Sequence, residues 1–136
     1  MRHIAIFVLF CALAGDAHAQ GTTVFRGRPL IKVSEAGRTR VPDELSRNEA
    51  INLECVISQI GDEYYWASRE NVRMVRIQSG AFITYVAVTG AGYVRIIPSD
   101  LKAAASLMSE TEVEFDYVEH ATFGLGSVTY WGKRQP

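Results

Sequence analysis

The sequence predicts a mainly β protein, either a small antiparallel barrel or a two-layer sandwich, leaning toward α+β because one amphipathic helix is expected late in the chain. Three observations lead to this fold class. Short segments in which apolar and polar residues alternate recur along the chain. Turns that contain glycine separate them, which is typical of antiparallel sheets. Only residues 99–109 combine helix-forming residues with an apolar stripe of helical spacing.

The N-terminal third of the chain contains few regular patterns. Residues 20–45 are rich in Gly, Thr, Arg and Pro, so we expect a loosely held arm, with one short strand at residues 30–34. Ser46 and Glu49 have the spacing of a capping box, in which each side chain bonds to the backbone N–H of the other residue. This spacing predicts a helical turn within residues 42–50.

Five strands are expected in the middle of the chain. The first places Leu53, Cys55 and Ile57 on one face, and Gly61 with Asp62 then provides a tight reversal. The fourth strand is apolar on both faces, which is usual for a strand that is central or covered. The expected strands cover residues 51–60, 63–68, 72–78, 81–89 and 93–97.

Two more strands are expected after the helix. Residues 111–118 alternate strictly, which places Phe115 and Tyr117 on the inward face. Residues 122–131 form the last strand, in which glycines permit a bend or a bulge. The polar tail at residues 132–136 is expected to fray.

The first nineteen residues have the features of a secretory signal peptide. Arg2 is followed by an apolar run at residues 4–14, and a small-x-small pattern at residues 17–19 predicts cleavage before Gln20. The run is too short to span a hydrocarbon core of ~30 Å as a helix. We therefore expect a signal peptide at 1–19, the arm at 20–45 and one β-rich domain at 46–136. The mature protein is expected to be periplasmic or secreted, without a stable membrane anchor.

Signal cleavage also limits the chemistry of the mature chain. Of two Cys and three His residues, only Cys55 and His120 remain, so no internal disulfide can form. A transition-metal site usually takes three or four ligands, and we expect neither a metal nor a cofactor. The formal net charge of −1 gives no electrostatic reason to expect nucleic-acid binding.

Aromatic residues are the most prominent candidates for binding, because exposed rings can stack on a sugar, a peptide or a partner protein. The same rings also favour strands and the core, so that alternative stays open. No catalytic residue is assigned. The candidate binding residues are Tyr64, Trp66, Arg69, Tyr85, His120 and Trp131.

Two reactive side chains are interpreted conservatively. Cys55 lies between apolar residues on one strand face, so we expect a small buried hydrophobe rather than a nucleophile. Glu119 and His120 are adjacent, and a carboxylate can tune an imidazole as a base. A strand that runs through both residues would direct them to opposite faces.

The sequence favours a small exported binding or inhibitory module whose partner is a protein, a saccharide or another component of the cell envelope. One alternative is a metal-independent hydrolase that uses Glu63, Asp116 or Glu119 together with His120. Another is a subunit of an envelope assembly, which requires an exposed apolar patch. Oligomeric state is left open, and no family resemblance guides the choice.

Overall fold

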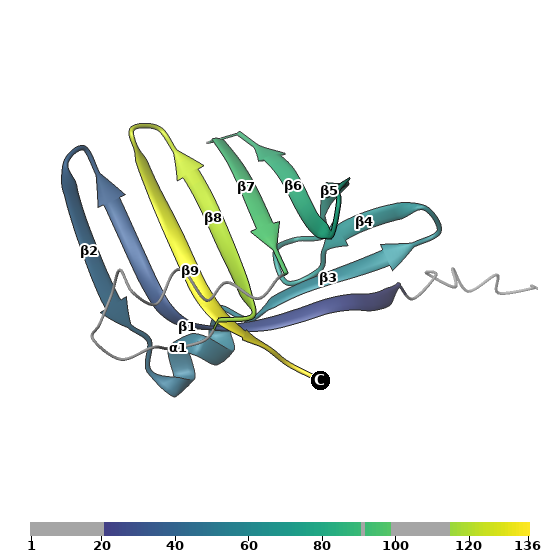
Figure 1. Ribbon diagram of the computed structural model, residues 1–136, viewed down its shortest axis with the longest axis horizontal. Coiled ribbons are helices and arrows are strands. Elements are labelled where there is room, and N and C mark those ends of the chain that lie inside the picture. The colour runs from purple at the N-terminus through teal and green to yellow at the C-terminus, as the bar shows by residue number, and fades with distance from the viewer. Residues whose placement is uncertain (1–20, 91, 99–114) are drawn as a thin grey trace, which may run out of the picture.

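The computed structural model describes residues 21–90, 92–98 and 115–136, and these residues form one antiparallel sheet with a short helix (Figure 1). The strand order is β2-β1-β3-β4-β5-β6-β7-β8-β9, and β1 also pairs with β9. That extra pairing closes eight strands into a barrel, which β2 extends along β1. The elements are β1 (Thr22–Ala36), β2 (Thr39–Glu44), α1 (Arg47–Asn52), β3 (Cys55–Ile60), β4 (Glu63–Trp66), β5 (Val72–Ser79), β6 (Phe82–Thr89), β7 (Gly92–Ile97), β8 (Tyr117–Phe123) and β9 (Gly126–Arg134).

The predicted fold class is confirmed, and the structure selects the barrel over the sandwich. The helix expected at residues 99–109 and the first half of the strand expected at 111–118 lie outside the described residues. Among the described residues, no helix is long and apolar enough to cross a membrane.

The largest difference from the prediction lies in residues 20–45, which were expected to form a loosely held arm. This segment forms β1, a strand of 15 residues that pairs with β2, β3 and β9, and then β2 itself. Phe25 and Val33 are buried on this strand. Pro29 lies where the register with β9 shifts, a position at which a strand tolerates a residue without an N–H. β1 is therefore the strand that closes the barrel.

Two glycines in the strands lie directly against an aromatic ring inside the barrel, which leaves no room for a Cβ atom. A Cβ atom at Gly27 on β1 would lie 2.5 Å from Cε1 of Tyr117, and one at Gly132 on β9 would lie equally close to the same atom. The Tyr117 ring also packs edge-on against Phe25, with ring centroids 5.3 Å apart. Glycine at these two positions thus marks a close approach between a side chain and the backbone rather than a loop.

The helical turn is confirmed as α1. Ser46 accepts a hydrogen bond from the Glu49 N–H, and the Glu49 carboxylate accepts one from the Ser46 N–H, which completes the capping box. Because α1 continues to Asn52, β3 begins at Cys55 rather than at residue 51. The inward alternation of Cys55 and Ile57 is as expected, since both are fully buried.

Residues 122–131, expected to form one strand, belong instead to a hairpin. β8 ends at Phe123, the chain reverses at Gly124 and Leu125, and β9 begins at Gly126. Gly124 has a φ of +53°, a left-handed conformation that glycine adopts without strain. Residues 132–134, expected to fray, continue β9 and pair with β1. The bend expected within residues 122–131 is thus a full reversal of the chain.

Candidate functional site

The aromatic candidates Tyr64, Trp66 and Tyr85 point into the barrel. Trp66 and Tyr85 are 6% and 5% exposed, and both belong to the main core cluster, against which Tyr64 packs. The Tyr64 and Tyr85 rings lie 5.4 Å apart between centroids. Trp66 and Tyr85 are therefore part of the interior, and Tyr64 is partly buried beside them. The rest of the buried cluster consists of Phe25, Cys55, Ile57, Met74, Ala87, Val94, Ile96 and Tyr117.

Arg69 holds the end of α1 in place. Its guanidinium donates hydrogen bonds to the carbonyl oxygens of Leu53 and Glu54, at 3.3 and 3.4 Å, and to that of Ser68. It also lies over the Trp66 ring, 5.4 Å from the centroid. These contacts satisfy carbonyl groups after the last helical turn and give Arg69 a structural role.

Trp131 belongs to a second, smaller cluster. Its ring lies 5.9 Å from that of the buried Phe115, and Ile31 packs beside them. Trp131 lies on the face of the sheet opposite to Tyr130, which faces the interior beside Glu119. The six candidates thus occupy separate parts of the fold, and His120 lines an open pocket at the surface.

Glu119 is the one buried charged side chain among the described residues. It is 3% exposed, and its Oε2 atom has no hydrogen-bond partner in that part of the chain. Burial raises its pKa to about 7, while the Arg69 guanidinium and the Cys55 thiol act in the opposite direction. β8 runs through Glu119 and His120, so His120 lies on the outer face, as expected for adjacent strand residues.

Other polar atoms near Glu119 are also buried. The Tyr117 hydroxyl and the Trp66 Nε1 find no hydrogen-bond partner within residues 21–90, 92–98 and 115–136. Burial raises the pKa of the Cys55 thiol well above its ordinary value, and the Glu119 carboxylate raises it further. Cys55 is fully buried, which confirms the interpretation as a small hydrophobe.

The carboxylates proposed for a hydrolase lie in separate places. Glu63 pairs with Arg73 at 2.6 Å. Asp116 accepts a hydrogen bond from the Arg134 N–H and lies 3.7 Å from the Lys133 ammonium. Glu119 is inside the barrel. Within the described ranges, moreover, no group of three or more His, Cys, Asp or Glu side chains could hold a metal ion.

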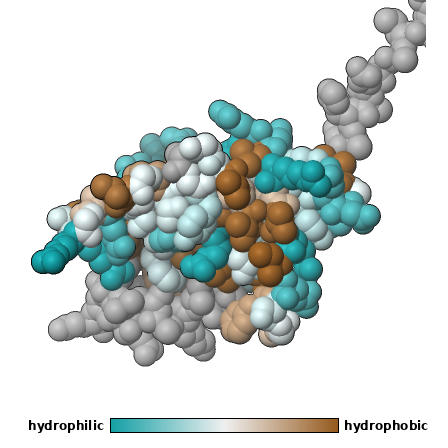
Figure 2. All heavy atoms as spheres, turned by 90° about the horizontal axis from the view of Figure 1, so that it is seen from above, coloured by the Kyte–Doolittle hydropathy of each residue, from teal (hydrophilic) through white to brown (hydrophobic). Residues whose placement is uncertain are grey.

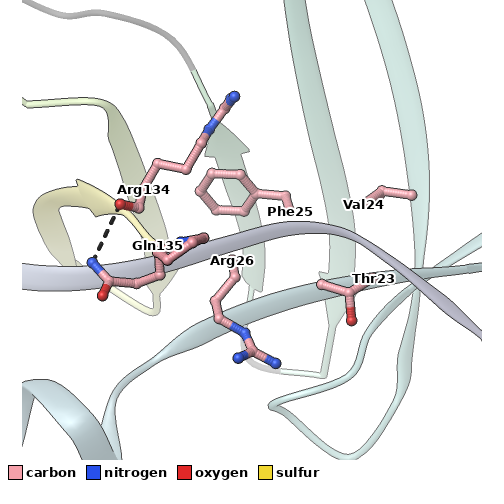
Figure 3. A pocket seen from close by; sticks show the side chains of 7 residues that line it. Thr23, Val24, Phe25, Arg26, Arg134 and Gln135 are labelled. Carbon is pink, nitrogen blue, oxygen red and sulfur yellow. Dashed lines mark hydrogen bonds between the residues drawn. The ribbon is translucent and has the colours of Figure 1, made fainter.

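A pocket of about 200 Å³ lies where the C-terminal tail crosses β1 (Figure 3). Arg26 and Arg134 both line it, but Figure 3 shows their side chains pointing away from each other. Arg134 extends along the Phe25 ring, 5.6 Å from its centroid. The two guanidinium groups therefore do not form a clamp for one anion.

His120 lines a larger pocket of about 360 Å³, which we call the hairpin pocket, between the β1–β2 and β8–β9 turns. Glu35, Ser127 and Thr122 lie side by side there, because β9 pairs with both β1 and β8 at this level. His120 Nδ1 is 2.9 Å from the Thr129 hydroxyl. The lining residues are Glu35, Gly37, His120, Thr122, Gly124, Leu125, Gly126 and Ser127.

The outer face of β5, β6 and β7 carries exposed apolar side chains. Val88 is 83% exposed, Val75 63%, Ile77 50% and Tyr93 43%. Val75 pairs with Val86, and Val88 pairs with Tyr93, so these side chains adjoin across the strands. Seen from above, hydrophobic atoms gather in one stretch, with hydrophilic atoms beside them (Figure 2). We call Val75, Ile77, Val86, Val88 and Tyr93 the apolar strip.

The apolar strip and the hairpin pocket belong to one continuous outer face. Val86 pairs with Arg95, Arg95 with His120, and His120 with Thr129, in an unbroken row from β6 to β9. The Tyr93 and His120 rings lie 6.4 Å apart. The surface thus changes from apolar on β5 and β6 to polar on β8 and β9.

Sequence reasoning missed the strip because it expected a strand with two apolar faces to be covered. Residues 81–89 do have two apolar faces, but on β6 the buried side chains are those of the inner face. The same pattern, together with the outward Val75 and Ile77 on β5, was the signal that could have revealed the strip. Glu119 also had a signal, since alternation places it on the same inward face as Tyr117.

Comparison of the chain with protein-family models, with curated proteins and with solved structures gives no match.

Proposed function

We propose that this protein is an exported binding module that docks a protein of the cell envelope against its apolar strip. The observation that carries the proposal is the exposure of neighbouring apolar side chains on three adjacent strands, with Val88 and Val75 the most exposed. Single exposed apolar residues are ordinary, whereas adjoining ones mark interaction surfaces.

The surroundings of the strip resemble the anatomy of a protein interface, in which an apolar centre is enclosed by a polar rim. Arg95 is exposed on β7, the strand that also carries Tyr93. It pairs with Val86 on the neighbouring strand. Arg73 lies on the same outward face of β5 as Val75, and its guanidinium forms a salt bridge with the Glu63 carboxylate. A partner that covers the strip therefore meets charged groups at its edges, which orient it.

Export is part of the proposal and rests on the signal-like residues 1–19. It is tested by expressing the full chain in its native host and determining the N-terminal residue of the product. The proposal expects Gln20 at the N-terminus and recovery outside the cytosol. An intact N-terminus on cytosolic protein contradicts it.

The hydrolase alternative has less support. Glu63 and Asp116 are engaged by basic or hydroxyl groups, and Glu119 lies on the opposite face of β8 from His120. A general acid and base must reach one substrate from one side. The described residues bring no carboxylate from this set to His120.

Docking is tested with a matched pair of variants. Val88→Lys places a charge in the strip, whereas Val41→Lys places one at an exposed position of β2, away from the strip. Each tagged protein is incubated with a solubilised envelope fraction, captured proteins are identified, and binding is then measured with the purified partner. We expect loss of binding by Val88→Lys and retention by Val41→Lys.

Two results distinguish the alternatives. Equal binding by both variants overturns docking on the strip. A partner that stays bound in fixed stoichiometry through purification supports the interpretation as a subunit of an envelope assembly, because permanent interfaces are larger and more apolar than transient ones.

A further inference from the structure

The hairpin pocket is a second binding site whose chemistry differs from that of the apolar strip. Its volume of about 360 Å³ falls at the lower end of the range of about 300–1,000 Å³ found for small-molecule sites. It is framed by two hairpin turns, so its walls belong to strands that are tied into the barrel. Its size suits one or two rings of a small ligand.

Glu35 is the one charged side chain in the pocket lining, and a residue outside the lining pairs with it. The Glu35 carboxylate pairs with the Arg40 guanidinium at 3.3 Å. Burial lowers the pKa of His120, and the nearby Arg95 guanidinium lowers it further. The Glu35 carboxylate raises this pKa, but its effect is the smallest of the three. The imidazole is therefore mostly neutral at pH 7. With Glu35 paired to Arg40 and His120 mostly neutral, the pocket gives no strong electrostatic preference to an anion or to a cation.

The pocket offers hydrogen-bonding groups that come from neighbouring strands of the sheet. Glu35 accepts, the Ser127 hydroxyl donates and accepts, and the imidazole of His120 can do one or the other at Nε2. The Thr122 hydroxyl is already engaged, since it accepts from the Tyr93 N–H at 3.2 Å. Leu125, fully exposed at the tip of the β8–β9 turn, adds an apolar contact beside these groups.

We propose that the hairpin pocket binds a neutral sugar residue. A pyranose ring carries hydroxyl groups around its edge and C–H groups on its faces. The hydroxyls match Glu35, His120 and Ser127, and a C–H face matches the Leu125 side chain. The site accepts a free sugar or the exposed end of a polysaccharide by the same contacts, and it acts independently of protein docking on the apolar strip.

The test uses isotope-labelled protein and defined probes. Maltotriose, cellotriose and chitotriose are titrated separately while backbone and imidazole resonances are followed by NMR. We expect at least one trisaccharide to shift His120, Leu125 and Ser127. His120→Ala and Ser127→Ala each remove one hydrogen-bonding group, and each should weaken binding about three- to tenfold. Val88→Lys in the strip is the control and should bind sugar normally.

Each outcome decides the proposal. If no probe shifts the pocket resonances at millimolar concentration, or if Val88→Lys abolishes sugar binding while His120→Ala does not, the proposal is wrong. Retention on amylose, cellulose or chitin shows whether the same pocket takes a polymer end, and retention lost in His120→Ala supports it. Protein docking through the strip can fail or succeed without changing any of these results.

Discussion

Replacement of Glu119 by Gln should stabilise the protein at alkaline pH and leave it nearly unchanged in mild acid. The folded protein holds the pKa of this carboxyl at about 7, against an ordinary value of 4.5, chiefly because the group is buried. A raised pKa means that the folded state favours the protonated form. The stability that this preference contributes is complete below pH 4.5 and is lost as pH rises through 7.

The magnitude follows from the difference between the two pKa values. At 1.36 kcal/mol for each pKa unit, ionisation of Glu119 costs the folded state about 3 kcal/mol by pH 8. The amide introduced by Glu119→Gln cannot ionise, so the variant should exceed the wild type by about this amount at pH 8. Burial also raises the pKa of Cys55 and Tyr117, which leaves Glu119 as the group of this cluster that titrates between pH 5 and 8.

Urea denaturation of both proteins at pH 5 and pH 8 measures the difference. Any titration of His120 on the outer face is common to wild type and variant and cancels in the comparison. Glu44→Gln, on the exposed strand β2, is the control and should change stability by less than about 0.5 kcal/mol at either pH. An equal effect of Glu119→Gln at both pH values, or destabilisation at pH 8, refutes the reasoning.

Three further predictions concern the fold itself. Gly132→Ala should lower stability by about 1–3 kcal/mol in urea denaturation, because its Cβ would lie 2.2 Å from the Arg28 carbonyl oxygen; unchanged stability would contradict that contact. Glu70→Gly should raise stability by up to about 1 kcal/mol, since Glu70 has a φ of +52°, and a lower thermal midpoint would exclude relief of strain there. The Cys55 thiol should react with a thiol reagent at least about 100-fold more slowly in native than in urea-unfolded protein, and comparable rates would show that the thiol is accessible.

Local signals in the sequence were sufficient for the elements that local contacts determine. The capping box needs only Ser46 and Glu49, and the turn at Gly61 needs only a residue that adopts a positive φ, which it does at +59°. Alternation alone placed Cys55 and Ile57 in the core. Each of these features depends on residues a few positions apart.

Features that depend on distant residues were not predictable in the same way. Gly27 and Pro29 made β1 look like a loop, yet Gly27 is required by the ring of Tyr117, ninety positions further along the chain. The outer face of β6 has the composition of a covered strand, and only the sheet topology reveals that Val88 is exposed. The burial of Trp66 and Tyr85 likewise follows from barrel closure, which brings β1 against β9.

We propose that partners contact the outer face of the barrel and not its interior. Methyl-labelled protein titrated with the captured envelope protein provides the most direct test, since valine and isoleucine methyl groups line both sides of the sheet. We expect shifts at Val75, Val88 and Ile77 on the apolar strip. The methyl groups of the buried Ile57 and Ile96 should stay unchanged. Shifts confined to Ile57 and Ile96 would place the ligand inside the barrel and contradict the account.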